Sequence, residues 1–170
     1  WSGEELSMYN IIKRVDNLVN LDTASAHCDI PCKIYDPIIS QISALSIVRL
    51  IDIINEVPAG SNDIGSINTI TRCVLRKEEE AAKVKQEVRV IWGDYFKTPQ
   101  FEKYPDMHEL THQIMMTASS CKQSVSREVG EELVNLVNQF SAAFWDTKGI
   151  SVEKKVCPYP PSLEIVYPII

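Results

Sequence analysis

The stretch PIISQISALSIVRLIDII, residues 37–54, decides the fold of this chain. Pro37 is acceptable at the first position of a helix, where its missing N–H would have no partner in any case. Apolar side chains then recur every three or four residues until the breaking sequence Pro58-Ala59-Gly60, which is the spacing of one helix face. The stretch therefore predicts an amphipathic core helix.

Three further stretches repeat this helical period. One follows the capping residues Ser61-Asn62-Asp63 and runs to Tyr95, one restarts at Pro105 after a break at Thr98-Pro99, and one follows Ser124 and ends at Gly149. No alternating strand pattern is evident. Four amphipathic helices joined by short connections predict an all-α fold, an antiparallel four-helix bundle.

Both ends of the chain extend beyond this bundle. A capping box at Ser2 precedes a helical stripe that predicts an extra amphipathic helix over residues 3–20. The prolines of residues 149–170 predict an irregular tail that either packs back on the bundle or docks on a partner. We expect Cys157 to lie exposed in this tail, where it could form a disulfide or contact a partner. We therefore divide the chain into a leader with linker (1–26), the bundle (27–148) and a Pro-rich extension (149–170).

The composition limits the classes of function. The chain has 170 residues, 45% of them hydrophobic, and a formal net charge of −6. This size fits one domain, and the acidic balance offers no basic face to a nucleic acid. No transmembrane span is expected, because charged residues and prolines interrupt the apolar runs. Five cysteines are an odd number and argue against a disulfide framework, so we expect Cys73 and Cys121 in the core.

A cluster of metal-binding residue types precedes the first core helix. His27, Cys28 and Cys32 lie within six residues, and Pro31 stiffens the segment between the cysteines. Two thiolates and an imidazole in one loop can chelate a single ion, although two buried cysteines near a histidine would leave the same pattern. Zinc would need a fourth ligand, and none lies at finger-like spacing.

A second metal-like pattern lies in the predicted third helix. His108 and His112 are four residues apart, and with Glu109 they formally match the pattern of a zinc hydrolase. The third ligand would have to come from elsewhere in the chain. We therefore favour an ordinary helix face here.

The first cluster carries a family resemblance. The segment His27-Cys28-Asp29-Ile30-Pro31-Cys32, followed by Tyr35-Asp36-Pro37, resembles the mature amino terminus of nickel-containing superoxide dismutases. The stretches Ile91 to Pro105 and Phe144 to Lys148 are similar to the helix junction and carboxyl end of that family. The resemblance covers residues 27–148 and implies a four-helix bundle that assembles as a homo-hexamer and disproportionates superoxide.

The resemblance also implies a nickel site and its surroundings. Nickel would be held by the thiolates of Cys28 and Cys32, the amide nitrogen of Cys28, and the free amino group and imidazole of His27. Tyr35 and Tyr95 would line the approach of superoxide and order water there, and Asp29 and Pro31 would fix the loop. A free amine at His27 requires a cut after Ala24-Ser25-Ala26, which looks like a processing site.

The chain departs from the family pattern at three positions around the site. Lys33 replaces a glycine, Ser43 stands where a glutamate usually orients the imidazole, and Glu80 stands where an arginine usually pairs with the aspartate of the hook. Lys33 could act instead as the partner of Asp29 or as a lure for the superoxide anion.

These departures and the two extensions leave an alternative function. The chain would then be an inactive structural subunit with the same fold, kept uncut and metal-free. Its extensions, 1–26 and 149–170, would dock in a larger complex, for which we suggest a photosystem-associated assembly in the plastid or on the thylakoid, since eukaryotic members of the family occur in algae.

Overall fold

The structure, a computed structural model, describes residues 33–170. The predicted helix over 3–20, the linker and the segment from His27 to Cys32 lie outside the described residues. Within the described part the four long helices are α2 (Ile38–Glu56), α3 (Ile64–Val90), α5 (Met107–Gln123) and α6 (Arg127–Thr147). They lie where the periodicity predicts them.

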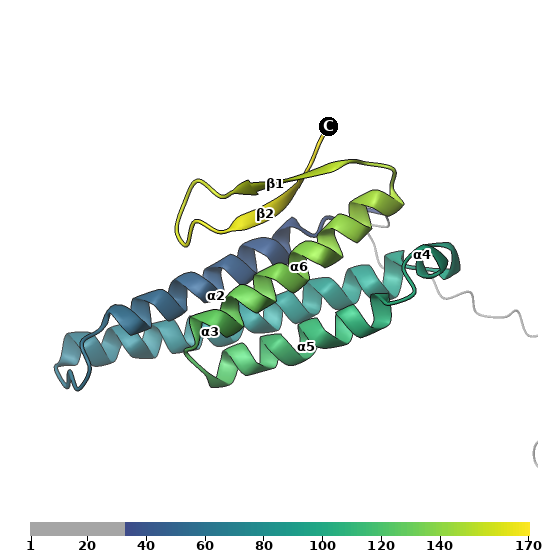
Figure 1. Ribbon diagram of the computed structural model, residues 1–170. Coiled ribbons are helices and arrows are strands. Elements are labelled where there is room, and N and C mark those ends of the chain that lie inside the picture. Colours follow the sequence, from purple (N-terminus) through teal and green to yellow (C-terminus); the bar gives the residue numbers. More distant parts are fainter. Residues whose placement is uncertain (1–32) are drawn as a thin grey trace, which may run out of the picture. The chain divides into compact units, whose positions relative to one another are not determined.

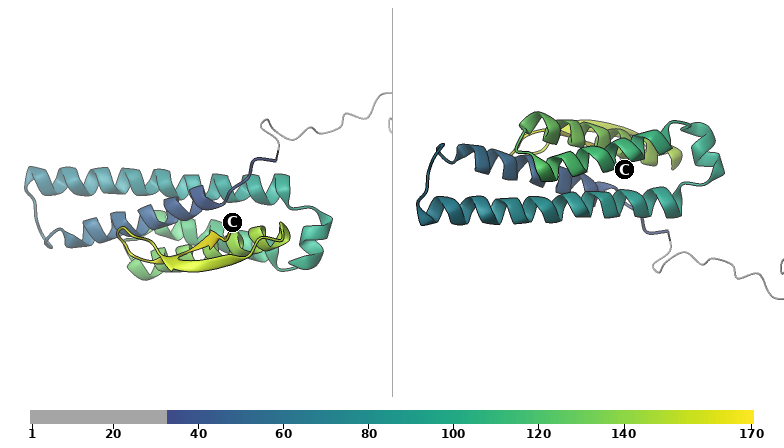
Figure 2. Two further views of the ribbon diagram at one scale, coloured as in Figure 1. Left: turned by 90° about the horizontal axis from the view of Figure 1, so that it is seen from above. Right: turned by 90° about the horizontal axis from the view of Figure 1, so that it is seen from below.

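The four long helices form one bundle (Figure 1). α2 packs against α3 and α6, and α5 packs against the same two helices, so each helix has two neighbours around a common core. Short loops reverse the chain between α2 and α3 and between α5 and α6, which makes these neighbours antiparallel, as the views from above and below also show (Figure 2). The all-α, antiparallel four-helix bundle is confirmed.

The helix ends have the residues that their exposed backbone groups require. Asp63 caps α3 by accepting a hydrogen bond from the Ser66 amide at 3.0 Å, and Ser126 caps α6 by accepting one from the Val129 amide at 3.3 Å. Gly149 has a φ of +72°, the left-handed conformation in which helices commonly end. These local signals explain why the predicted boundaries hold.

A buried lysine closes the carboxyl end of α5. Lys77 of α3 is only 2% exposed, and its Nζ donates hydrogen bonds to the carbonyls of Cys121, Lys122 (2.9 Å) and Ser124 (2.7 Å). The last carbonyls of a helix have no partner within the helix. Lys77 thus supplies from α3 the donors that α5 lacks. Cys73 and Cys121 are both buried, as predicted.

The carboxyl extension corrects one prediction. It is not irregular: β1 (Val152–Val156) and β2 (Glu164–Pro168) form an antiparallel hairpin in which Lys154 pairs with Val166. Ile165 and Val166 are buried, and the hairpin packs against α6 (Figure 1). The prolines exclude a helix but lie in the connection or at the strand's last residue, where they cost no ladder hydrogen bond.

Two polar side chains fasten this hairpin to the bundle. Asn138 of α6 donates to the Glu164 carbonyl at 2.8 Å and accepts from the Val166 amide at 3.2 Å, while Gln41 of α2 donates to the Val166 carbonyl at 3.0 Å. Cys157 is 2% exposed, so its predicted exposure is wrong. Of the two possibilities open to the tail, it packs back on the bundle.

Within residues 33–170, α2 is the one helix that is long and apolar enough to cross a membrane by length and composition, with a mean hydropathy of 1.5. The charged residues and prolines that interrupt the apolar runs predict no such segment. Of this stretch 44% is buried inside the bundle, and core helices of bundles commonly pass the same test. Its packing against α3 and α6 accounts for the buried part of its apolar surface, while Ile39 and Ile42 stay exposed.

Candidate functional site

The described part of the site begins directly after the second predicted thiolate ligand. The predicted metal ligands His27, Cys28 and Cys32, with the predicted loop residues Asp29 and Pro31, lie outside the described residues. Lys33 has a φ of +72°, a conformation that favours glycine. The position where the family resemblance expects glycine thus keeps the backbone that glycine would adopt, although a lysine occupies it.

Tyr35 enters the bundle through a short fixed turn. The carboxylate of Asp36 accepts a hydrogen bond from the Ile38 amide at 2.8 Å, and Pro37 is buried at the start of α2. The Asp36 side chain satisfies one of the amides that the first helical turn leaves unpaired. The sequence Tyr-Asp-Pro therefore anchors the chain between the predicted hook and α2, and it holds Tyr35 half-buried at that point.

Tyr95 reaches the same place from the end of α3. The helix widens into a π-helical turn, η1 (Ile91–Tyr95), which closes with a hydrogen bond from the Phe96 amide to the Ile91 carbonyl at 3.3 Å. Such turns are rare and often lie at functional sites, because the inserted residue re-aims the side chains that follow. The apolar periodicity predicts an unbroken α-helical stripe as far as Tyr95, so the π-helical turn is a difference from that prediction.

The two predicted tyrosines come together. Their ring centroids are 6.0 Å apart with a tilt of 57°, and Tyr95 also packs edge-on against Phe144 of α6 at 4.8 Å. Aromatic pairs prefer such tilted contacts. Residues 60 positions apart in the sequence thus form one aromatic wall beside the chain that leads to the predicted hook.

The end of α6 contributes two residues that the sequence analysis did not assign. The Tyr95 hydroxyl lies 2.7 Å from the Thr147 Oγ1, and the Lys148 ammonium lies 4.9 Å from the centre of the Tyr95 ring. A cation over an aromatic face is attracted by the ring quadrupole. The only signal in the sequence was that both residues fall in the stretch from Phe144 to Lys148.

The other two departures lie on α2 and α3. Ser43 is 1% exposed, and its hydroxyl has no hydrogen-bond partner among the described residues. Glu80 is 5% exposed and pairs with Arg76 at 2.5 Å, about four helical turns before Tyr95. Glu80 therefore has its own cation, and an unused acceptor remains at Ser43.

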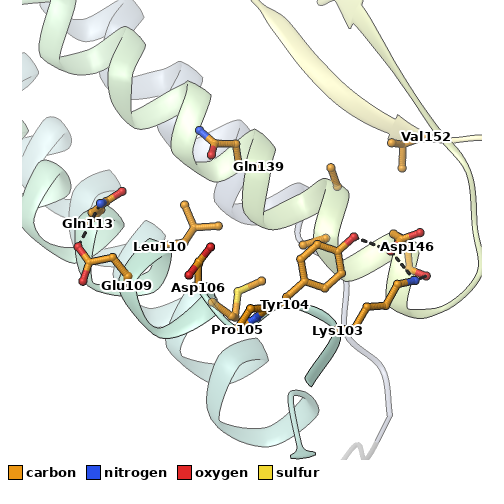
Figure 3. Close-up of a pocket in the computed structure, with 13 residues that line it drawn as sticks. Lys103, Tyr104, Pro105, Asp106, Glu109, Leu110, Gln113, Gln139, Asp146 and Val152 are labelled. Atoms are coloured by element: carbon orange, nitrogen blue, oxygen red, sulfur yellow. Dashed lines mark hydrogen bonds and ion pairs between the residues drawn. The ribbon is translucent and has the colours of Figure 1, made fainter. Parts of the chain in front are cut away.

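A groove borders the site on the far side of Asp146 (Figure 3). It has a volume of about 810 Å³ and lies between the α4 (Thr98–Lys103) to α5 junction, α6 and β1. At its end the Tyr104 hydroxyl donates to the Asp146 carboxylate at 2.5 Å, and Lys103 pairs with the same carboxylate at 2.5 Å. These contacts tie the α4 segment to the last turn of α6.

The contact between Tyr104 and Asp146 shifts the pKa values of both groups. Burial, and then the hydrogen bond to Asp146, raises the pKa of Tyr104 to about 12. The hydrogen bonds from Lys103 and Tyr104 lower the pKa of Asp146. Tyr104 therefore stays a neutral phenol and Asp146 stays a carboxylate across the neutral range.

The His108 and His112 pair gains no third ligand within residues 33–170, where no three His, Cys, Asp or Glu residues gather as a metal site would require. His108 instead stacks on Phe101 with ring centroids 4.3 Å apart, and its Nδ1 accepts a hydrogen bond from Trp92 at 3.2 Å. This histidine belongs to the aromatic packing at the helix junction.

Comparisons with known proteins agree with this geometry. A family model described as nickel-containing superoxide dismutase matches residues 22–148. The superoxide dismutase [Ni] of Streptomyces coelicolor is 38% identical over 126 residues, which cover 74% of this chain and 91% of that protein. The enzyme of Streptomyces seoulensis is 36% identical over 124 residues, covering 73% and 89%.

Solved structures of the same kind of protein are also similar. The native structure of a nickel superoxide dismutase matches with a TM-score of 0.63 and 36% identity, covering 72% of this chain and 99% of that chain. A structure whose nickel ligation corresponds to the oxidized state matches with a TM-score of 0.63 and 32% identity, with the same coverage. The β-hairpin at residues 152–168 lies beyond the range that the family model matches.

Proposed function

This chain belongs to the nickel-containing superoxide dismutase family, and from this premise we propose that it disproportionates superoxide to oxygen and hydrogen peroxide once His27 is the free amino terminus and nickel is bound. The observation that carries the proposal is the Tyr35 and Tyr95 pair, which forms a half-buried aromatic wall at the chain segment that follows Cys32.

The donor set fits nickel. The thiolates of Cys28 and Cys32, the amide nitrogen of Cys28 and the amine and imidazole of His27 would hold it, and such anionic sulfur and nitrogen donors suit a redox-active ion. Nickel held there would supply a centre that takes up and gives back one electron. The unused buried hydroxyl of Ser43 is an acceptor at the position where the resemblance expects the group that orients the imidazole.

The described residues provide for an anionic substrate. The whole chain carries a net charge of −6, which repels superoxide, so a local cation matters for its approach. Lys148 supplies one over the ring of Tyr95, and the exposed Lys33 adds a second beside Tyr35 in the sequence. The hydroxyl-bearing wall orders water, from which the protons of hydrogen peroxide would come.

The test compares three forms of the protein after incubation with nickel. One begins at His27, one is the full chain, and one begins at His27 and carries Cys28→Ser with Cys32→Ser as the matched control. Nickel content is measured by mass spectrometry of the metal, and superoxide decay by stopped-flow absorbance. We expect about one nickel per chain and fast decay only in the first form.

Slow decay in a form that begins at His27 and holds nickel would refute the proposal. It would favour the alternative of a structural subunit with the same fold. The homo-hexamer is tested on the same samples by sedimentation, and the plastid location by immunolabelling of the source cells; both stay predictions.

A further inference from the structure

The direction of one hydrogen bond at the tyrosine pair follows from counting hydrogens. The Thr147 Oγ1 lies 2.7 Å from the Tyr95 hydroxyl and 2.7 Å from the Phe144 carbonyl oxygen. The carbonyl can only accept, and a threonine hydroxyl has a single hydrogen to donate. Thr147 therefore donates to Phe144, and the remaining hydrogen bond requires that Tyr95 donates to Thr147.

The last turn of α6 is built to keep Thr147 in place. The Gly149 amide donates to the Asp146 carbonyl and the Ile150 amide to the Trp145 carbonyl, both at 3.0 Å, which is the pattern of a Schellman cap. On the outer side the Asp146 carboxylate is held by Lys103 and Tyr104, as described above. The hydroxyl of Thr147 therefore has little freedom to turn away from Tyr95.

We propose, on the basis of the proposed function, that Thr147 is a positioning residue that makes the Tyr95 hydroxyl an acceptor toward the substrate approach. With its only hydrogen engaged by Thr147, Tyr95 offers lone pairs to any molecule beside it. Water and hydrogen peroxide can donate to those lone pairs. The superoxide anion has no hydrogen to give, so Tyr95 holds water or product, while attraction of the anion falls to the cations nearby.

The variants Thr147→Val and Thr147→Ser separate this role from a merely structural one. Valine has nearly the shape of threonine and removes the acceptor, whereas serine keeps the hydroxyl. Both are made in the full, metal-free chain, so that the readout needs neither nickel nor activity. Thermal unfolding of each variant confirms that the bundle still forms.

The first readout is the Raman doublet of tyrosine, whose intensity ratio differs between a phenol that donates and one that accepts. Subtracting the spectrum of Tyr95→Phe from that of the parent isolates Tyr95 among the six tyrosines. We expect a donating phenol in the parent and in Thr147→Ser, and a change of the ratio in Thr147→Val. An unchanged ratio in Thr147→Val, or an accepting phenol in the parent, would overturn the proposal.

The second readout is a double-mutant cycle in the form that begins at His27 and is loaded with nickel. We expect Thr147→Val to slow superoxide decay by on the order of five-fold, the worth of one hydrogen bond, and to have no further effect when Tyr95 is already phenylalanine. An equal loss in both backgrounds would show that Thr147 acts by another route. If the parent itself is inactive, the proposed function fails, while the Raman comparison still decides the orientation of Tyr95.

Discussion

Replacement of Lys77 by methionine tests how the bundle closes the end of α5. Methionine keeps most of the apolar length of the side chain and removes the ammonium that three carbonyls share. Cys121 is fully buried, so its carbonyl would lose a partner that water cannot easily replace, at a cost of about 1–3 kcal/mol. The carbonyls of Lys122 and Ser124 lie nearer to solvent, and we assign each about 0.5 kcal/mol.

One effect opposes this loss. Burial lowers the pKa of the Lys77 ammonium, which means that the folded chain carries a desolvation cost that methionine would relieve. The balance is a loss of about 2 kcal/mol in the free energy of unfolding. For a chain of this size it corresponds to a fall of the melting temperature by roughly 4–8 °C.

The assay is urea unfolding followed by circular dichroism, with Lys83→Met as the matched control. Lys83 lies on the exposed face of the same helix, so its replacement removes the same charge without touching α5. We expect the free energy of unfolding of Lys83→Met to differ from that of the parent by less than about 0.5 kcal/mol. If Lys77→Met lowers the free energy of unfolding by no more than Lys83→Met does, the contacts with the three carbonyls contribute no stability and the reasoning is refuted.

Three further predictions follow from single contacts. Lys33→Gly keeps the left-handed backbone, so the free energy of unfolding should change by no more than about 1 kcal/mol. The variant also removes a cation, so the rate of superoxide decay should depend less on salt. An unchanged salt dependence would show that Lys33 does not attract the superoxide anion. Asn138→Ala removes the side chain that accepts from the Val166 amide, so this amide should exchange with deuterium on the order of ten-fold faster or more, as the loss of one buried hydrogen bond implies. Unchanged slow exchange would show that Asn138 does not hold the hairpin. The raised pKa of Tyr104 means that the folded chain keeps the phenol proton, while the unfolded chain loses it near pH 10. The free energy of unfolding should therefore fall as the pH rises from about 10 toward 12, and it should fall less steeply in Tyr104→Phe. Parallel curves for the two proteins would exclude Tyr104 as the cause.

The long helices could be read from the sequence because their signals are local. A residue such as Val48 or Phe140 belongs to an apolar stripe whose period is visible within one helix, and Asp63, Ser126 and Gly149 mark ends by local chemistry. The ligand types of the predicted nickel site, His27 with its cysteines, are likewise contiguous. Such features need no partner from elsewhere in the chain to be recognised.

The hairpin was missed because its strands are short and contain little alternation, so that nothing local distinguishes Val152–Val156 from an irregular segment. It is fastened to the bundle by the burial of Ile165 and Val166 and by hydrogen bonds from Asn138 and Gln41, which lie on helices far away in the sequence. The same reason explains the wrong prediction for Cys157, since the fold of the hairpin and not the composition of the tail decides its burial.

The sequence by itself thus determined the helices and the family, since periodicity and contiguous motifs are properties of neighbouring residues, and it predicts the residues that would hold the metal. Only the tertiary structure decided what surrounds the tyrosines. The π-helical turn turns Tyr95 toward Tyr35, and the end of α6 brings Thr147 and Lys148 to it. The direction of a hydrogen bond depends on every donor and acceptor within reach, and that set exists only once the helices have packed.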